Sequence, residues 1–269
     1  KMVRLMIRTW LDLPAGGLFA TLFVIYFGMA ALLAIVVFAS PLKRPVQTLA
    51  GIVAPFFSAV AVLFSLLTGF LANDIGDRSR LASRALQAEA SELRNVYTLS
   101  IASVSDMADI RRALKGYIDS VIADDWPALS LGQHSPKTDA AYDELLRQVS
   151  DPRIAKESGN AVHGALMGAA VRAGTARNER LALSGDQTND IKWIVVLLLG
   201  LFTQVAIAAV HLDRPRAFVA SLTIFSTAVV IALGFIALQE YPFYGAIALK
   251  PESLSTLQAL PEMPGAPAR

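Results

Sequence analysis

Four apolar stretches dominate the chain, at Leu18–Ala39, Ile52–Ala72, Ile194–Val210 and Phe218–Leu238. None of them contains a charged residue. A helix needs about 20 apolar residues to cross the hydrocarbon core of a bilayer, so each stretch predicts a transmembrane helix. Trp193 and Tyr241 lie at the ends of the third and fourth stretches, where interfacial aromatic residues are expected.

The segment 73–190, between the second and third stretches, has the polarity and the 3.6-residue periodicity of water-exposed helices. The helices predicted within it are, in order, Asp77–Ser105, a second helix from the candidate N-cap Asp106 to Trp126 and Pro127, Asp139–Val149 and Arg153–Ser184. We expect the first and last of these helices to continue the second and third apolar stretches. No strand-like alternation is present.

These elements predict an all-α integral membrane protein, with four transmembrane helices and a helical cytoplasmic domain inserted between the second and third. The expected parts are an N-terminal cytoplasmic segment at 1–17, helices one and two within 18–72, the cytoplasmic domain at 73–190, helices three and four within 191–239, and a tail at 240–269. Four spans place both termini and the inserted domain on one side, and the Lys and Arg residues flanking the domain favour the cytoplasm. The proline-containing tail from Leu254 is expected to be loose.

Composition supports a membrane class and excludes several kinds of chemistry. The chain is 54% hydrophobic and 17% charged, against about 45–50% and about 25% in typical soluble domains. It has no cysteine, and its histidines at 134, 163 and 211 are not at metal-ligand spacing. No phosphate-binding loop, HExxH or GxSxG motif is present. We therefore predict no enzyme activity, metal or cofactor, and a net charge of +2 gives no reason to expect nucleic acid.

The second apolar stretch has large residues mainly on one broad face and a series of small residues at three- and four-residue spacing. The small residues are Ala61, Ser65, Gly69, Ala72 and Gly76. One interpretation turns the bulky face to lipid and the small residues to a partner helix. The other turns the bulky face to a pore, where aromatic rings narrow the path and gate it by dewetting. The polar residues of the third and fourth stretches predict hydrogen bonds between helices. They are Thr203 and Gln204 in the third, and Ser221, Thr223, Ser226 and Thr227 in the fourth.

The end of the second stretch carries the clearest family resemblance. Residues 64–78 read FSLLTGFLANDIGDR, which resembles the bestrophin pattern of a Phe/Leu-rich span followed by Asn and an Asp-Arg pair. The sequence is more similar to the bestrophin-like family of bacterial membrane proteins, whose further elements recur in order over most of Phe56 to Glu252. They are here Gln87 to Ala90, Arg111 to Tyr117 with Trp126, Pro242 to Gly245, and Pro251-Glu252.

The resemblance implies a multi-pass protein of the bacterial inner membrane and, through the bestrophins, a homo-oligomeric, pentameric channel for chloride or other small anions. Its hydrophobic neck would be lined by Phe56, Val60, Phe64 and Leu67. The cytoplasmic mouth would hold Asn73, Asp77, Arg78 and Arg80. Ser79-Arg80 stands where the bestrophins have two tryptophans, and only Glu240 and Glu252 are acidic near the end of the fourth span. The resemblance therefore does not extend to calcium gating.

Two functions remain open at this stage. The first is the anion channel, with Arg78 and Arg80 raising the local anion concentration at the mouth. The second is a non-conducting membrane scaffold or accessory subunit, whose helical domain binds a protein partner in the cytoplasm. A ring of copies with the second span innermost would favour the channel, whereas a monomer would favour the scaffold.

Overall fold

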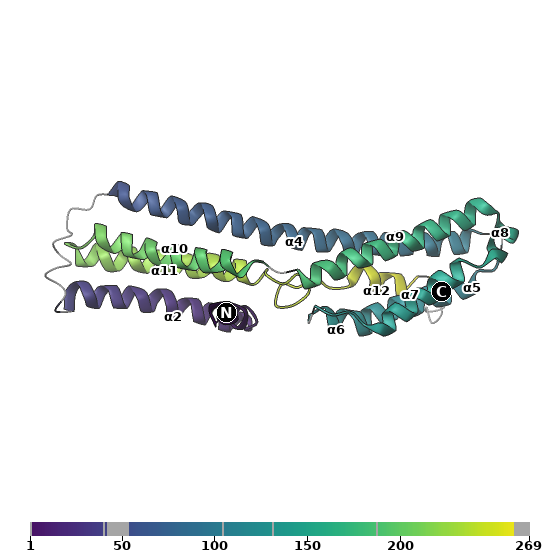
Figure 1. The fold of residues 1–269 in the computed structure, drawn as a ribbon, viewed down its shortest axis with the longest axis horizontal. Coiled ribbons are helices and arrows are strands. Elements are labelled where there is room, and N and C mark those ends of the chain that lie inside the picture. The colour runs from purple at the N-terminus through teal and green to yellow at the C-terminus, as the bar shows by residue number, and fades with distance from the viewer. Residues whose placement is uncertain are drawn as a thin grey trace. The chain divides into compact units, whose positions relative to one another are not determined.

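A computed structural model describes residues 2–39, 41, 54–103, 105–130, 132–186 and 188–260. These residues are helical, with turns between the helices and no strand among them (Figure 1). The chain divides into two compact units. The first comprises Lys1–Asp77 and Thr188–Glu240, and the second comprises Arg78–Gln187 and Tyr241–Arg269. The predicted all-α class is confirmed.

The first unit contains the four predicted apolar helices. They are α2 (Ala15–Ala34) with the π-helical turn η1 (Ile35–Ala39), the first half of α4 (Ala54–Ala102), α10 (Asp190–Val210) and α11 (Pro215–Ala237). By length and composition each of the four is able to cross a membrane. The four apolar helices are thus confirmed at the predicted places along the chain.

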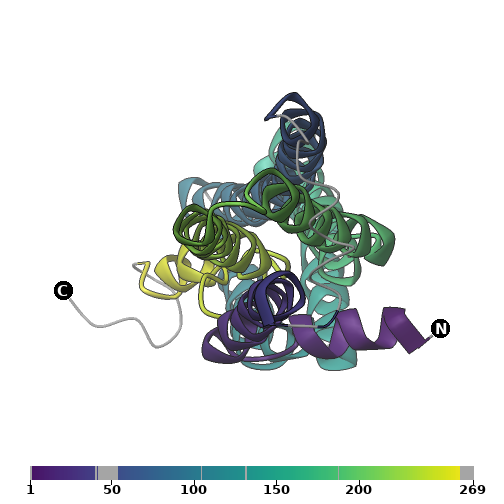
Figure 2. The same ribbon diagram turned by 90° about the vertical axis from the view of Figure 1, so that its left-hand side faces the viewer.

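Helices α2, α10 and α11 lie side by side (Figures 1 and 2). Their close approach depends on small residues. A Cβ atom at Gly200 of α10 would overlap the ring of Tyr26 on α2, and one at Gly234 of α11 would overlap Phe19 on the same helix. Gln204 joins the three helices, because its Nε2 donates to Tyr26 O and to Ser226 Oγ, both at 2.8 Å. The predicted hydrogen bonding between the third and fourth spans is confirmed at Gln204 and Ser226.

The segment 1–17, for which no helix was predicted, contains the helix α1 (Met2–Leu11). Its side chains Ile7, Trp10 and Leu11 are buried in the first unit. Trp10 Nε1 donates to Leu18 O of α2 at 3.3 Å. The Trp10 ring also meets the Trp193 ring edge to face, with centroids 5.3 Å apart. The sequence reading missed α1 because it is short and carries two arginines.

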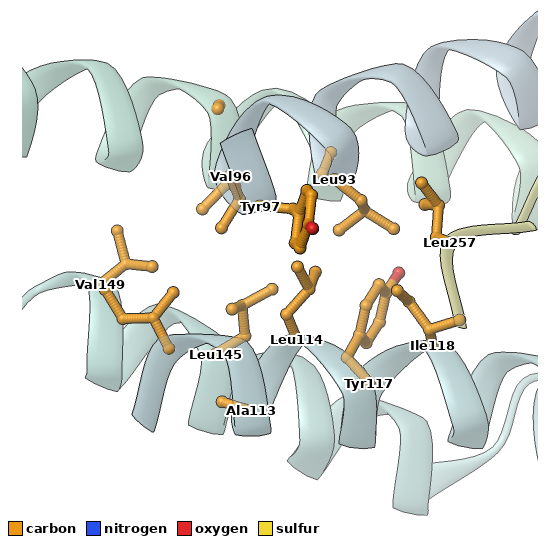
Figure 3. Packing of buried hydrophobic residues seen from close by; sticks show 14 of the residues in the cluster. Leu93, Val96, Tyr97, Ala113, Leu114, Tyr117, Ile118, Leu145, Val149 and Leu257 are labelled. Atoms are coloured by element: carbon orange, nitrogen blue, oxygen red, sulfur yellow. The ribbon is translucent and has the colours of Figure 1, made fainter. Parts of the chain in front are cut away.

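The second unit is a helical domain built around the second half of α4. Its other elements are α5 (Ala108–Ser120), the π-helical turn η2 (Val121–Asp125), α6 (Trp126–Leu129), α7 (Pro136–Val149), α8 (Pro152–Ser158), α9 (Asn160–Gly185) and α12 (Glu252–Gln258). Figure 3 shows the core, in which Leu93 and Val96 of α4 face Leu114 and Tyr117 of α5 and Leu145 of α7. The predicted apolar spacing thus corresponds to one shared core.

Of the two predictions about helix continuity, one is confirmed and the other is wrong. The second apolar stretch does continue into the polar segment, since α4 runs unbroken from Ala54 to Ala102. The third does not, because α9 ends at Gly185 and α10 begins at Asp190. Asn189 caps α10 by accepting the Ile191 N–H at 3.0 Å, which is a start signal that the prediction overlooked.

Three boundaries within the second unit also differ from the prediction. The single helix expected over Arg153–Ser184 is interrupted at Gly159, whose φ of 88° favours glycine. Trp126 and Pro127 do not end a helix, because Pro127 lies in the first turn of α6, where it is tolerated. The tail is not loose up to Leu260, because Leu254 and Leu257 of α12 are buried in the core.

Candidate functional site

The apolar half of α4 has a covered and an uncovered face. The covered face carries Phe64, which is 9% exposed and packs against Phe225 of α11 with ring centroids 5.9 Å apart. Val60 and Leu67 are half-buried, and Leu67 lines an apolar groove of about 310 Å³ that Phe70, Ile191 and other residues of α4 and α10 complete. The side chain of Phe56 lies outside the described residues. Val60, Phe64 and Leu67 therefore share one face, and their place in a neck stays a prediction.

The uncovered face of α4 is also apolar. Val62, Leu63 and Leu66 are exposed there, and Phe70, which also lines the groove, is exposed at the edge of this face. A Cβ atom added at Gly69 or Gly76 would meet nothing within 4 Å in the described part of the chain. Within that part, no other helix of the same copy therefore packs closely against these two glycines. In this they differ from Gly200 of α10 and Gly234 of α11.

Three of the polar residues at the end of the first unit are paired with one another or with α10. Asn73 Nδ2 donates to Asp77 Oδ2 at 2.9 Å, one turn further along α4. Asp74 forms an ion pair with Lys192 at 2.8 Å, and both side chains are partly exposed. Lys192 was not part of the predicted cluster. It adds a cation at the start of α10 that offsets the Asp74 charge.

The two arginines at the start of the second unit differ in their surroundings. Arg78 is buried, and its Nη1 donates to the carbonyl oxygen of Asp186 at the C-terminal end of α9, at 3.1 Å. A cation at this position is favourable because the last carbonyls of a helix carry partial negative charge. Arg80 is exposed. Arg78 therefore joins α4 to α9, while Arg80 lies at the surface.

A buried charge network is the most polar feature of the second unit. Arg180 of α9 is fully buried and forms an ion pair with Glu89 of α4 at 2.7 Å. Tyr117 donates its hydroxyl to the other Glu89 oxygen at 2.6 Å. Asp125, at the end of η2, accepts from Arg180 at 3.4 Å and from Arg177 at 3.3 Å. The network thus holds together α4, α5, η2 and α9.

The local backbone explains how Asp125 and its neighbour Trp126 reach this network. The π-helical turn η2 shifts the helix register ahead of α6, and Asp125 Oδ1 accepts the Ser135 N–H at 2.8 Å. Trp126 covers the Arg180 guanidinium, which lies 5.6 Å from its ring centroid. The Trp126 ring also meets the Phe243 ring edge to face, with ring centroids 5.6 Å apart. The segment that follows α11 is therefore packed onto the network residues.

The pKa shifts in the network keep Arg180 charged and Tyr117 neutral. Burial disfavours the charged form of Arg180, but the charge and hydrogen bond of Glu89, together with other groups that include Asp125, outweigh burial, so the pKa of Arg180 lies above its ordinary value. Burial, and then the negative charge of Glu89, raise the pKa of Tyr117 well above its ordinary value. Tyr117 therefore remains a neutral hydroxyl donor. Among the described residues, no group of three or more His, Asp or Glu side chains could hold a metal ion.

The sequence analysis included Glu89, Tyr117, Trp126 and the two arginines, but neither Asp125 nor the association of these residues. Glu89, Tyr117 and Trp126 occur in the elements that carry the family resemblance, and Arg177 and Arg180 entered only as basic flanking residues. The ion pair between Glu89 and Arg180 joins positions 91 residues apart, so no local spacing could reveal it. Two arginines at helical i, i+3 spacing in an otherwise Ala-rich helix were the available signal.

These features define a helical membrane protein, with four helices able to span a bilayer and a helical unit that contains a network of buried charges. The family model described as the Bestrophin-like domain matches residues 9–254, and the chain belongs to that family. A search of curated proteins found no match.

Solved structures show the same fold. A bacterial bestrophin homologue from Klebsiella pneumoniae is similar with a TM-score of 0.68 and 14% identity, over 93% of this chain and 99% of that chain. A single-substitution variant of a Klebsiella pneumoniae bestrophin homologue is similar with a TM-score of 0.66 and 15% identity, over 89% of this chain and 94% of that chain. A further structure, described only as that of a membrane protein variant, is similar with a TM-score of 0.68 and 13% identity, over 89% of this chain and 96% of that chain. At these identities the likeness concerns the fold alone.

Proposed function

We propose that this chain assembles in the bacterial inner membrane into a homo-oligomeric channel for chloride or other small anions, with α4 lining the path. Membership of the Bestrophin-like family and the fold shared with bestrophin homologues support the proposal. Both termini and the second unit would lie in the cytoplasm, and a pentamer is expected by analogy with the bestrophins.

The observation that carries the proposal is the incomplete packing of α4 within one copy. Only 11% of its most apolar stretch is buried, against 44% for α10. Helices associate in a bilayer through close packing, and open positions such as Gly69 allow it. Copies arranged around an axis would cover part of α4 and leave another part facing the path.

Within that arrangement, Phe56, Val60, Phe64 and Leu67 are the proposed lining of the hydrophobic neck. Aromatic rings have positive edges that can face a partly dehydrated anion. Because Phe64 packs on Phe225 in the single copy, this lining requires the ring to turn away from α11 on assembly. The uncovered residues Val62 and Leu66 form the competing lining.

At the mouth, Asn73, Asp77, Arg78 and Arg80 are the proposed polar residues. Arg80 is exposed and would raise the local concentration of anions. Arg78 would act by holding α4 to the end of α9, since its guanidinium donates to Asp186 O.

The absence of cysteine from the sequence allows a direct test. The purified chain would be reconstituted in liposomes, with its copy number measured by native mass spectrometry and its chloride flux by a halide electrode. Single cysteines at Val60, Phe64 or Leu67, and at Val62 or Leu66, would then be modified with a negatively charged methanethiosulfonate reagent. A cysteine at Ile224 of α11, which is exposed on a different span, provides the matched control.

A ring of copies with flux that falls on modification at Val60, Phe64 or Leu67, but not at Ile224, supports the channel and the proposed neck. If modification at Val62 and Leu66 lowers the flux instead, the result supports the channel and refutes the neck assignment. A one- or two-copy particle without flux refutes the channel, and the scaffold that binds a protein partner then becomes the better explanation.

A further inference from the structure

Helix α1 carries large apolar side chains on its exposed side as well as on its buried side. Ile7, Trp10 and Leu11 are buried against the first unit, whereas Leu5 is 69% exposed and Met6 is 63% exposed. Two adjacent large apolar side chains at this exposure are unfavourable in water, because each would gain by burial. Something apolar must therefore cover this face of α1.

The contacts of α1 place the uncovered face at the ends of two spans. Trp10 donates to Leu18 O, at the start of the first apolar stretch, and its ring contacts Trp193, at the start of the third. Arg8 Nε forms an ion pair with Asp190 in the first turn of α10, at 2.6 Å. Leu5 and Met6 are thus held on a helix fixed where the apolar segments of α2 and α10 begin.

We infer that α1 is an interfacial helix that lies along the bilayer surface, with Leu5 and Met6 inserted among the lipid acyl chains. Short helices with an apolar face and basic residues bind in this way, with the apolar side chains about 5–10 Å below the headgroup boundary. Trp10 and Trp193 are also the residue type found at that depth.

Position favours lipid over a second copy as the covering partner. Helix α1 contacts the starts of α2 and α10, both of which are long and apolar enough to cross a membrane. By composition α1 contains Arg4 and Arg8 and no acidic residue, which suits a leaflet that contains anionic lipids.

A nitroxide label on single cysteines tests this inference in the whole chain, which has no native cysteine. Leu5→Cys and Met6→Cys would be labelled in vesicles of phosphatidylethanolamine and phosphatidylglycerol. Collision of the label with oxygen, which partitions into the bilayer, would be compared with collision with a water-soluble nickel chelate. Ile224→Cys, 70% exposed on α11, gives the lipid reference, and Arg147→Cys, whose native side chain is 74% exposed on α7, gives the water reference.

We expect the labels at Leu5 and Met6 to collide more with oxygen than with nickel, as at Ile224, at a depth of about 5–10 Å. Nickel collision equal to that at Arg147 would overturn the inference. So would dipolar broadening that disappears on dilution with the cysteine-free chain, since it would identify a second copy as the covering partner. Neither result depends on chloride flux, so the inference can fail without the proposed function.

Discussion

Replacing Arg180 with methionine should destabilise the second unit strongly, because it leaves the buried Glu89 carboxylate without its cation. Glu89 would lose hydrogen bonds of 2.7 and 3.3 Å and retain the Tyr117 hydroxyl at 2.6 Å. Removing one partner of a buried ion pair costs about 3–5 kcal/mol. The retained hydroxyl places this case at about 3 kcal/mol, and in a unit of this size that lowers the unfolding temperature by roughly 10 °C.

The assay is thermal unfolding of the detergent-solubilised chain followed by far-ultraviolet circular dichroism. Arg172→Met on the same helix is the matched control, because Arg172 is exposed and pairs with Glu92 on the surface. Such exposed pairs contribute little, so the control should unfold near the temperature of the unsubstituted chain. Adding Glu89→Gln to Arg180→Met should recover much of the loss, because a neutral amide costs less to bury than a charge.

An Arg180→Met variant that unfolds at the same temperature as the control, or a double variant without recovery, would refute the account of the network.

Three further predictions follow from particular contacts. Gly200→Ala should lower stability by about 1–3 kcal/mol, because the new Cβ atom would overlap a buried tyrosine ring of α2. Gly69→Ala should not lower stability, because the space around Gly69 is open. Thermal aggregation of the two variants in detergent would compare them. Leu254→Ala should cost about 2–5 kcal/mol in the same unfolding assay as Arg180→Met, because Leu254 is fully buried. The hydrogen bond from Arg172 lowers the pKa of Glu92, so its stabilising contribution is present at neutral pH and lost as the pH falls through the lowered pKa. The unfolding temperatures of the unsubstituted chain and of Glu92→Gln should therefore differ only slightly at neutral pH, because the pair is exposed, and converge in acid.

Much of the fold could be predicted because its strongest determinant is local. Long uncharged stretches identify the four apolar helices, and the spacing of residues such as Leu93, Val96 and Leu114 identifies the core-facing sides of α4 and α5. Polar residues in the third and fourth spans also indicated hydrogen bonds between helices, and Gln204 and Ser226 do meet. These signals depend on neighbours within a few turns of helix.

The features that were missed depend on distant contacts or on single backbone conformations. Leu254 and Leu257 form only a short apolar pair in sequence, and α12 is stabilised by burial against helices more than a hundred residues earlier. Gly159 interrupts a helical pattern that periodicity alone continues. The charges of Glu89, Asp125 and Arg180 predict solvated faces when considered one at a time, because a buried charge is recognisable only by its partner.

The two faces of α4 show most clearly what the sequence pattern cannot distinguish. In a soluble helix the polar residues mark the side that faces water, but Phe64 on the covered face and Leu66 on the uncovered face are both apolar. Lipid, a neighbouring copy and a dewetted neck can each receive such a side chain, so hydrophobicity does not distinguish among them. The distinguishing property is access of a water-soluble anion to the side chain. Modification of single cysteines at these two positions measures that access directly, and it is therefore the experiment on which the proposed neck depends.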